Sequence, residues 1–251
     1  MKILVILPCY NEEENLKSLI HKIDGTLRYF TPYEIIAVND GSQDGTGEIL
    51  KELSNSYPII ITEHSTNKGL SEALSTGIKT ALQHSSDEDF IITMDADNTH
   101  DPKYILNMFK LAKNGTDIVI GSRYVYCGKQ TNVSPYRALM SKMINFLTRK
   151  IAKLPVKDAT SGYRCYKSSV LKKTVENLGP SFLESKGFEA SFELLLKIFW
   201  CCSNVKEIPI MLDYSKKKGK SKMRILPTIK RYFIALTKIK GWRKQVLGFT
   251  S

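Results

Sequence analysis

The sequence predicts an α/β fold, with a mainly parallel central sheet in one domain (residues 1–223) and an amphipathic helical extension at the C-terminus (residues 224–251). Three observations lead to this prediction. Strand-like and helix-like segments alternate through the first half of the chain, as they do when helices join parallel strands. The 251 residues are 42% hydrophobic and 25% charged, which is typical of a globular chain. We find no internal repeat and no Gly/Ser-rich linker that would separate two domains.

In the first half, short apolar runs alternate with amphipathic segments. Residues 12–29, for example, carry Leu16, Leu19, Ile23 and Leu27 at helical spacing. Asp44 can cap the helix that follows it, and Pro102 precedes another helix start. We expect strands at residues 3–7, 34–39, 59–63, 90–95 and 118–122, and helices at 12–29, 45–53, 70–82 and 103–112.

The pattern changes after Arg123. Residues 124–133 are polar and poor in strand formers, so we expect a mobile loop there. Ile229, Leu236 and Ile239 belong to an apolar stripe at helical spacing near the C-terminus, after the basic loop 216–222. Between the loop at 124–133 and the basic loop at 216–222, we expect helices at residues 136–152 and 189–200, and strands at 163–167 and 205–214.

The cysteines and the apolar runs bear on the compartment of the protein. The five cysteines include no C-x-x-C pair, so neither a disulfide framework nor a zinc site is indicated, which favours a reducing cytosol. The N-terminal run ILVIL is too short for a signal peptide. No segment approaches the roughly 20 apolar residues of a membrane helix. We therefore expect a cytoplasmic protein that is soluble or peripheral to a membrane.

The segment FIITMDADNTHDP is the most informative part of the sequence. A buried strand precedes Asp95 and Asp97, and strand alternation sends both carboxylates to the same side. Ligands of open α/β sheets bind at this carboxyl end of the strands. Two close carboxylates repel each other unless a divalent cation lies between them and an anion. The pair thus predicts Mg²⁺ or Mn²⁺ bridging the protein and a diphosphate, although two loop acids near a helix start would look the same.

The net charge of +12 suggests an anionic partner. Two further loops follow directly after predicted strands. The loop PCYNEEEN places an aromatic ring and carboxylates where a base or ribose could bind, but acidic residues also suit a helix start. The loop NDGSQDG directs Asp40 out of the second strand, although turn formation alone could explain its composition.

Taken together, the blocks PCYNEEEN, VNDGSQDGT, NKGLSEAL, MDADNTHDP and GSRY resemble glycosyltransferase family 2. Later blocks narrow the resemblance to the dolichol-phosphate mannose synthase group and its bacterial polyprenyl-phosphate relatives. These blocks are R-x-x-x-S-x-x-x-N from Arg137, DATSGYR from Asp158, G-F-x-x-S-x-E from Gly187 and G-x-S-K from Gly219. The resemblance reaches about residue 223. It implies a GT-A fold and inverting, metal-dependent transfer of a hexose, most commonly mannose from GDP-mannose, to a polyprenyl phosphate.

The resemblance also implies roles for individual residues. Asp97 and Arg123 would be catalytic, and Asp95, Asp97 and Thr99 would hold the metal. Arg123, Arg137 and Ser141 would bind the acceptor phosphate. The donor would be bound by Pro8, Tyr10, Asn11, Glu12, Asp40, Ser42, Lys68, Asp95, Lys216 and Lys222.

Two positions depart from the family pattern. Thr99 stands where relatives usually have Gln, and a threonine hydroxyl is a weaker metal ligand. Lys216 stands where relatives usually have Arg, and lysine keeps the charge but loses the bidentate fork. These departures concern metal affinity and the grip on the diphosphate, whereas the reaction class does not depend on them.

The chemistry of the acceptor favours a lipid phosphate. A phosphate monoester is largely dianionic near neutral pH, since its second pKa is about 6. It needs arginines to place it, whereas a hydroxyl acceptor needs a general base. The polysaccharide synthases of the family carry Glu-Asp and Gln-x-x-Arg-Trp motifs, and neither is present, since Gly241-Trp242-Arg243 does not match.

The basic C-terminal region permits two interpretations. Its charges and apolar stripe could lie on an anionic bilayer, or the helix could pack on the protein's own core. We expect a protein on the cytosolic face of a membrane, with a nucleotide diphosphate sugar, a polyprenyl phosphate and either the anionic membrane surface or a membrane-anchoring subunit as partners. A family 2 transferase with a hydroxyl acceptor is the alternative. A nucleic-acid-binding module is a remote alternative, because the basic residues are concentrated in one region near the C-terminus.

Overall fold

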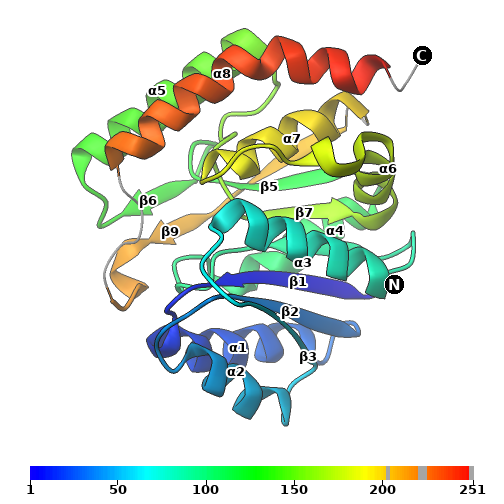
Figure 1. Cartoon of the computed structure of the whole chain (residues 1–251), viewed down its shortest axis with the longest axis vertical. Coiled ribbons are helices and arrows are strands. Elements are labelled where there is room, and N and C mark those ends of the chain that lie inside the picture. Colours follow the sequence, from blue (N-terminus) through cyan, green and yellow to red (C-terminus); the bar gives the residue numbers. More distant parts are fainter. Residues whose placement is uncertain (202–203, 220–224, 249–251) are drawn as a thin grey trace.

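A computed structural model of the chain describes residues 1–201, 204–219 and 225–248. Its centre is a seven-stranded sheet in the order β3-β2-β1-β4-β7-β5-β8 (Figure 1). The strands are β1 (Ile3–Cys9), β2 (Tyr33–Asp40), β3 (Ile59–His64), β4 (Phe90–Thr93), β5 (Ile118–Ser122), β7 (Arg164–Lys167) and β8 (Val205–Pro209). A second sheet pairs β6 (Lys129–Thr131) with β9 (Met211–Asp213). The predicted α/β fold with a mainly parallel sheet is confirmed.

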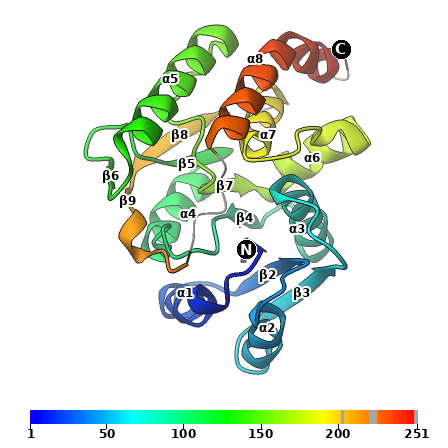
Figure 2. The same cartoon turned by 60° about the vertical axis from the view of Figure 1, so that its left-hand side comes forward.

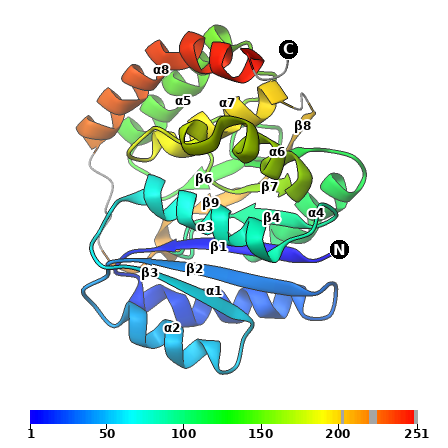
Figure 3. The ribbon, with the colours of Figure 1, turned by 45° about the vertical axis from the view of Figure 1, so that its right-hand side comes forward.

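Helices cover both faces of the sheet (Figure 3). On one face lie α1 (Glu13–Leu27), α2 (Thr46–Ser54) and α4 (Ile105–Lys113), the last of which follows a 3₁₀ turn at Pro102–Tyr104. On the other lie α3 (Leu70–His84), α6 (Ser168–Leu178) and α7 (Glu189–Cys201). A further layer, α5 (Pro135–Ala152) and α8 (Ile225–Gly248), lies beyond α7 (Figure 1). None of the helices in the described part of the chain has the length and hydropathy of a membrane-spanning segment.

The central strands are buried on both sides, which explains their unbroken apolar runs. In β1, Ile3, Val5 and Leu7 join the core beneath α1, while Leu4 and Ile6 join the core beneath α3. Parallel strands covered by helices on both faces have this composition. Because β1, β2, β4 and β5 run in the same direction, their carboxyl ends lie at one edge of the sheet.

One strand of the sheet runs against the others. Strand β7 is antiparallel to both of its neighbours, β4 and β5, whereas the remaining pairs of the sheet are parallel. Its beginning therefore lies at the edge where the neighbouring strands end. As a consequence, the segment before β7, which includes Thr160 and Gly162, faces the same space as the loops after β4 and β5.

Several predicted elements differ in detail. Strand β4 ends at Thr93, so Asp95 lies in the following turn. The segment 124–133, expected as a loop, contains β6, which forms only because β9 pairs with it from far along the chain (Figure 2). The expected strand 205–214 is divided into β8 and β9, which belong to different sheets. Helix α6 had no predicted counterpart, because its buried face includes Ser168 and Thr174 beside Leu171 and Leu178, which weakens the apolar stripe.

Helix α8 continues the core rather than standing apart from it. Tyr232, Leu236, Ile239, Trp242 and Val246 are buried in the same apolar cluster as α7. The ring of Trp242 lies 6.4 Å from that of Phe192 in α7, edge on. The interpretation of α8 as a helix packed on its own core is therefore confirmed for this face, whereas the division of the chain at residue 223 stays a prediction.

Candidate active site

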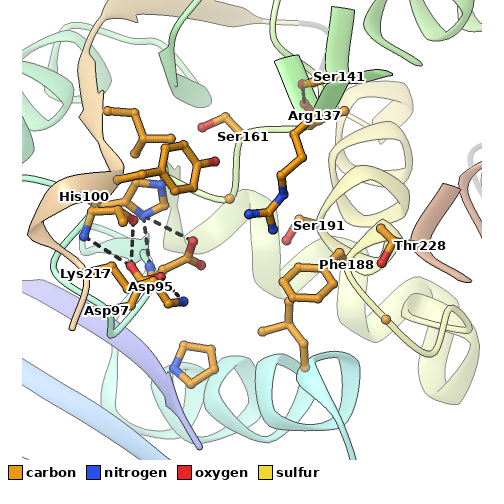
Figure 4. A pocket seen from close by; sticks show the side chains of 18 of the residues that line it. Asp95, Asp97, His100, Arg137, Ser141, Ser161, Phe188, Ser191, Lys217 and Thr228 are labelled. Carbon is orange, nitrogen blue, oxygen red and sulfur yellow. Dashed lines mark hydrogen bonds and ion pairs between the residues drawn. The ribbon is translucent and has the colours of Figure 1, made fainter. Parts of the chain in front are cut away.

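A cavity of about 840 Å³ opens at the carboxyl edge of the sheet, beneath α5 and α8. Its lining brings together loops from both halves of the chain, as the sequence predicts. Figure 4 shows two chemically different ends: Asp95, Asp97, His100 and Lys217 gather at one, and the side chain of Arg137 points in from the other. The predicted residues that line it are Pro8, Tyr10, Glu12, Asp40, Asp95, Asp97, Thr99, Arg123, Arg137 and Ser141.

The two aspartates lie in the turn after β4. Asn98 adopts a left-handed backbone conformation, with φ of 63°, and this turn directs Asp97 back into the cavity. The Thr99 backbone N–H and hydroxyl donate to Asp97 Oδ1 at 3.1 and 2.6 Å. Lys217 Nζ lies 2.7 Å from Asp97 Oδ2. Thr99 thus orients Asp97 through its hydroxyl, and its role as a metal ligand stays a prediction.

His100 supports the first aspartate. The backbone N–H of Asp95 donates to His100 Nδ1 at 2.9 Å, so Nδ1 acts as a hydrogen-bond acceptor. The imidazole also stacks on Tyr163, with ring centroids 4.8 Å apart. These contacts fix the backbone of Asp95 and leave its half-exposed carboxylate facing the cavity.

The electrostatics keep Asp97 ionised. Burial opposes its ionisation, but the ammonium of Lys217 and the hydrogen bonds from Lys217 and Thr99 outweigh burial, so the pKa of Asp97 lies below its usual range. An anionic carboxylate that already attracts one cationic group suits a metal-binding role. Within residues 1–201, 204–219 and 225–248, no three Asp, Glu, His or Cys side chains form a metal site by themselves.

The donor set nevertheless fits a divalent cation that is shared with a ligand. Mg²⁺ is commonly held by one or two carboxylates together with substrate phosphates, rather than by a complete protein cage. Asp95 and Asp97 supply hard oxygen ligands of this kind, and both face a cavity large enough for a ligand. Lys217 adds positive charge at the same place.

Arg123 is held by a buried partner that the sequence analysis left without a role. Asp158 accepts from Arg123 Nε and Nη2, each at 2.7 Å, and the carboxylate is fully buried. Burial disfavours both charges, but their mutual attraction raises the pKa of Arg123 and lowers that of Asp158. Nη2 also donates to Thr160 at 2.8 Å and lies 3.4 Å from Ser141 Oγ. The guanidinium is therefore rigidly placed beside Ser141.

Arg137 approaches the same region from α5. Ser134 caps that helix by accepting from the Arg137 backbone N–H, which places Arg137 in the first turn and Ser141 one turn later. The Arg137 guanidinium lies over the ring of Tyr214, 6.0 Å from its centroid. Arg123, Arg137 and Ser141 of the predicted set thus line the same cavity, with Arg123 beside Ser141.

The predicted donor residues divide into two groups. Tyr10, Glu12 and Asp40 line the cavity, but the Asp40 carboxylate already accepts from the backbone N–H groups of Lys68 and Gly69, at 2.9 and 2.8 Å. It therefore holds a loop at the cavity wall. Four residues do not line this cavity: Asn11 and Ser42 bond to each other, Lys68 is exposed, and Lys216 pairs with Asp101 at 3.4 Å. Lys222 lies outside the described residues. All these donor assignments stay predictions.

The sequence model of glycosyl transferase family 2 matches residues 4–175. The chain belongs to this family. This family 2 glycosyltransferase is 37% identical over 250 residues to the dolichol-phosphate mannosyltransferase of Pyrococcus furiosus, in an alignment that covers 98% of the chain and 66% of the relative. The chain thus spans slightly less than two thirds of that relative. Polyprenol monophosphomannose synthase of Mycolicibacterium smegmatis is 32% identical, with 88% of the chain and 80% of the relative covered.

Solved structures show the same fold at lower identity. Glucosyl-3-phosphoglycerate synthase of Mycobacterium tuberculosis, solved with Mn²⁺, UDP and glucosyl-3-phosphoglycerate, superposes with a TM-score of 0.67 at 17% identity. The superposition covers 96% of this chain and 79% of the synthase chain. Residues 1–349 of S. aureus TarS, solved with UDP-GlcNAc, give a TM-score of 0.61 at 17% identity, with 98% and 70% covered. The glycosyltransferase therefore has a GT-A-like fold.

Three residues of this glycosyltransferase had no role in the sequence analysis. Lys217 sits beside Lys216 in a run of lysines, and no periodicity in a loop tells which one faces inward. Asp158 and His100 were visible only as parts of the quoted blocks DATSGYR and MDADNTHDP. The acid in the first block could have suggested a partner for an arginine, whereas the contact of His100 with Asp95 requires the turn geometry.

Proposed function

We propose that this glycosyltransferase moves a hexosyl group, mannose from GDP-mannose in the first instance, from a nucleotide diphosphate sugar to a polyprenyl phosphate, with inversion and with Mg²⁺ or Mn²⁺. The observation that carries the proposal is the polarity of the cavity. Paired carboxylates and Lys217 gather at one end, Arg137 and Ser141 lie away from them (Figure 4), and Arg123 lines the same cavity 3.4 Å from Ser141. The names of the two relatives, a dolichol-phosphate mannosyltransferase and a polyprenol monophosphomannose synthase, support mannose as the sugar and a polyprenol as the acceptor class.

The chain's own residues account for the main requirements of the reaction. Asp95 and Asp97 would hold the divalent cation, which neutralises a diphosphate leaving group when bound. Lys217 lies at the same place and would meet the diphosphate directly, and nothing in the sequence distinguishes it from Lys216 in this respect. Arg123, fixed by Asp158, and Arg137 would place the acceptor phosphate, whose own charge makes it a nucleophile without a strong base.

The acceptor's hydrocarbon tail requires contact with a membrane, and the layer of α5 and α8 supports such a contact. Tyr136, Leu139 and Phe146 of α5 are exposed and follow one another at helical spacing. Phe233 and Ile234 of α8 are also exposed, and Arg137 and Ser141 belong to the same layer. Basic residues of α8 are exposed around them (Lys230, Lys238, Lys240, Arg243 and Lys244). We place the protein on the cytosolic face of a membrane, with this layer against the anionic surface or a membrane-anchoring subunit.

The test combines donor screening with a variant of the acceptor end. Radiolabelled GDP and UDP sugars are incubated with undecaprenyl or dolichyl phosphate, and the lipid product is extracted. Arg137→Ala is expected to raise the apparent KM for the polyprenyl phosphate far more than the KM for the donor, because Arg137 lies at the end of the cavity away from Asp95 and Asp97. Lys142→Ala, an exposed substitution on the same helix that does not line the cavity, is the matched control.

Two outcomes would change the proposal. Transfer to a sugar hydroxyl, with none to a lipid phosphate, would establish the alternative function of a family 2 transferase in polysaccharide or glycolipid synthesis. Equal effects of Arg137→Ala on both substrates would move Arg137 to the donor site or to a structural role.

A further inference from the structure

Asn15 occupies a buried position that joins three separate parts of the chain. It lies in the first turn of α1, and only 1% of its surface is exposed. It does not line the cavity, so it has no direct access to a substrate there. An amide that is buried this completely needs hydrogen-bond partners for both its carbonyl and its N–H groups.

The side chain of Asn15 pairs with the backbone of the basic loop. Its Nδ2 donates to the carbonyl oxygen of Lys218 at 3.2 Å, and the Lys218 backbone N–H donates to Asn15 Oδ1 at 3.1 Å. This two-point contact resembles one step of a strand ladder and spans 203 positions of sequence. It fixes the backbone of the residue that directly follows Lys217.

The amide is itself held in one orientation. Asn15 Nδ2 also donates to Glu12 Oε2 at 2.7 Å, so the nitrogen and the oxygen of the amide cannot exchange places without losing this bond. On the opposite side, the backbone carbonyl of Asn15 accepts from Asn98 Nδ2 at 2.9 Å. Asn98 directly follows Asp97 and supplies the left-handed turn that returns Asp97 to the cavity.

Asn15 therefore contacts the immediate neighbour of each member of the Asp97–Lys217 ion pair. We infer that Asn15 is a positioning residue for the donor site: it registers residues 216–219 of the basic loop against the aspartate turn, so that the Lys217 ammonium stands beside Asp97 where a nucleotide diphosphate and its cation would bind. The inference rests on the proposed function for the identity of the ligand. Its structural part, the fixation of the loop by the amide, does not depend on that function.

The chemistry of the contact suggests a nearly isosteric test. Asn15→Asp keeps the acceptor that Lys218 N–H uses, but it replaces the donor with an anionic oxygen facing the Lys218 carbonyl and the Glu12 carboxylate. The loop should therefore separate from α1 while the volume of the core is preserved. Asn107→Asp, on the exposed surface of α4, is the matched control for the added charge.

The first measurement needs no ligand. Limited trypsin digestion, followed by mass spectrometry, reports the cleavage rate after Lys216, Lys217 and Lys218 in the full-length protein. Asn15→Asp is expected to accelerate cleavage at these sites, whereas Asn107→Asp leaves the rate unchanged. An unchanged rate in Asn15→Asp would overturn the inference, whatever the protein's substrates are.

The second measurement is a double-mutant cycle on binding of GDP and UDP in the presence of Mn²⁺, by calorimetry. Asn15→Asp is expected to weaken binding of the preferred nucleotide roughly 10–100-fold, which is typical for a residue that supports a ligand-contacting group. In the Lys217→Ala background, Asn15→Asp should weaken nucleotide binding only slightly further, because the two residues act through one contact. Additive losses would show that Asn15 acts elsewhere and would overturn the inference.

Two provisions separate the possible failures. If Asn15→Asp is insoluble, it is replaced by Asn15→Ala, which introduces no charge. Asn15→Ala is then tested in the same digestion and the same double-mutant cycle, and the same results support or overturn the inference. If the unmodified protein binds neither nucleotide with Mn²⁺, the proposed donor class is wrong, while the digestion still decides whether Asn15 holds the loop.

Discussion

At the scale of single residues, the site depends on how a few charges are neutralised. Asp97 has two hydrogen bonds from Thr99 and an ion pair with Lys217, so its carboxylate is both oriented and ionised. Such a carboxylate can take up a divalent cation without first losing a proton. Arg123 is fixed in a comparable way by Asp158, since the buried pair restrains the guanidinium.

Asp97→Ala is expected to reduce the transfer rate on the order of 10²–10³-fold, because a positioned group that stabilises developing charge is lost. The fold should remain, since Asp97 lies in a turn outside the sheet and its side chain faces the cavity. Steady-state rates with added Mg²⁺ or Mn²⁺, together with far-UV circular dichroism, provide the check. A variant that transfers sugar at the wild-type rate, with a chelator present, would contradict the assigned metal role.

Ten of the predicted site residues line the cavity, but their contacts with one another and with Lys217 could not be predicted. Strand alternation predicted that Asp95 and Asp97 share one side, and both do line the cavity. The physical cause differs, because β4 ends at Thr93 and the left-handed turn at Asn98 directs Asp97 inward. Loop contacts of this kind depend on distant segments, such as the loop that carries Lys217, and no local pattern encodes them.

At the scale of elements, α5 and α8 combine a buried and an exposed apolar side. The buried side of α8 carries Leu236 and Trp242, whereas Phe233 and Ile234 are exposed. A sequence stripe at helical spacing predicts that a helix is amphipathic, but it does not say which protein or lipid surface covers each side. For this reason the sequence alone left both interpretations of the C-terminal region open. The structure shows that α8 has both a face buried in the core and an exposed apolar face.

Leu139→Ser combined with Phe146→Ser is expected to weaken binding to anionic vesicles, because the pair removes exposed apolar area from α5. Sedimentation with phosphatidylglycerol vesicles, at low and high salt, measures the effect. The matched control is Tyr29→Ser combined with Phe30→Ser, two exposed aromatic residues in the loop after α1, a helix that lies far from α5 (Figure 1). Equal vesicle binding by both double variants and the parent would assign the exposed face of α5 to another partner.

At the scale of the whole molecule, the C-terminal helix is tied to the loop that borders the cavity. Trp242 Nε1 donates to Glu184 Oε2 at 3.2 Å, and its ring lies 5.4 Å from the ammonium of Lys197. Lys197 and Glu193 form a fully buried ion pair in α7, and Glu193 accepts from the backbone of residues 184 and 185. The segment that continues to the cavity-lining Phe188 is thus anchored on both helices.

Trp242→Ala is expected to lower the free energy of unfolding by about 3–5 kcal/mol, since it leaves a large cavity between α7 and α8. Chemical denaturation followed by circular dichroism measures this change. Phe233→Ala, which removes an exposed ring from the same helix, should cost far less and serves as the control. If the two variants were equally stable, α8 would be a detachable extension rather than part of the core.

The position of β7 has a consequence for the order in which the nascent chain can fold. Strand β5 is synthesised well before β7, yet its described sheet partners are β7 and β8, both of which emerge later from the ribosome. Until residue 167 is available, β4 has an unpaired edge and β5 has no strand beside it. Exposed edges and waiting apolar strands favour aggregation during synthesis. The first four strands can therefore assemble early, whereas completion of the sheet must wait for the second half of the chain.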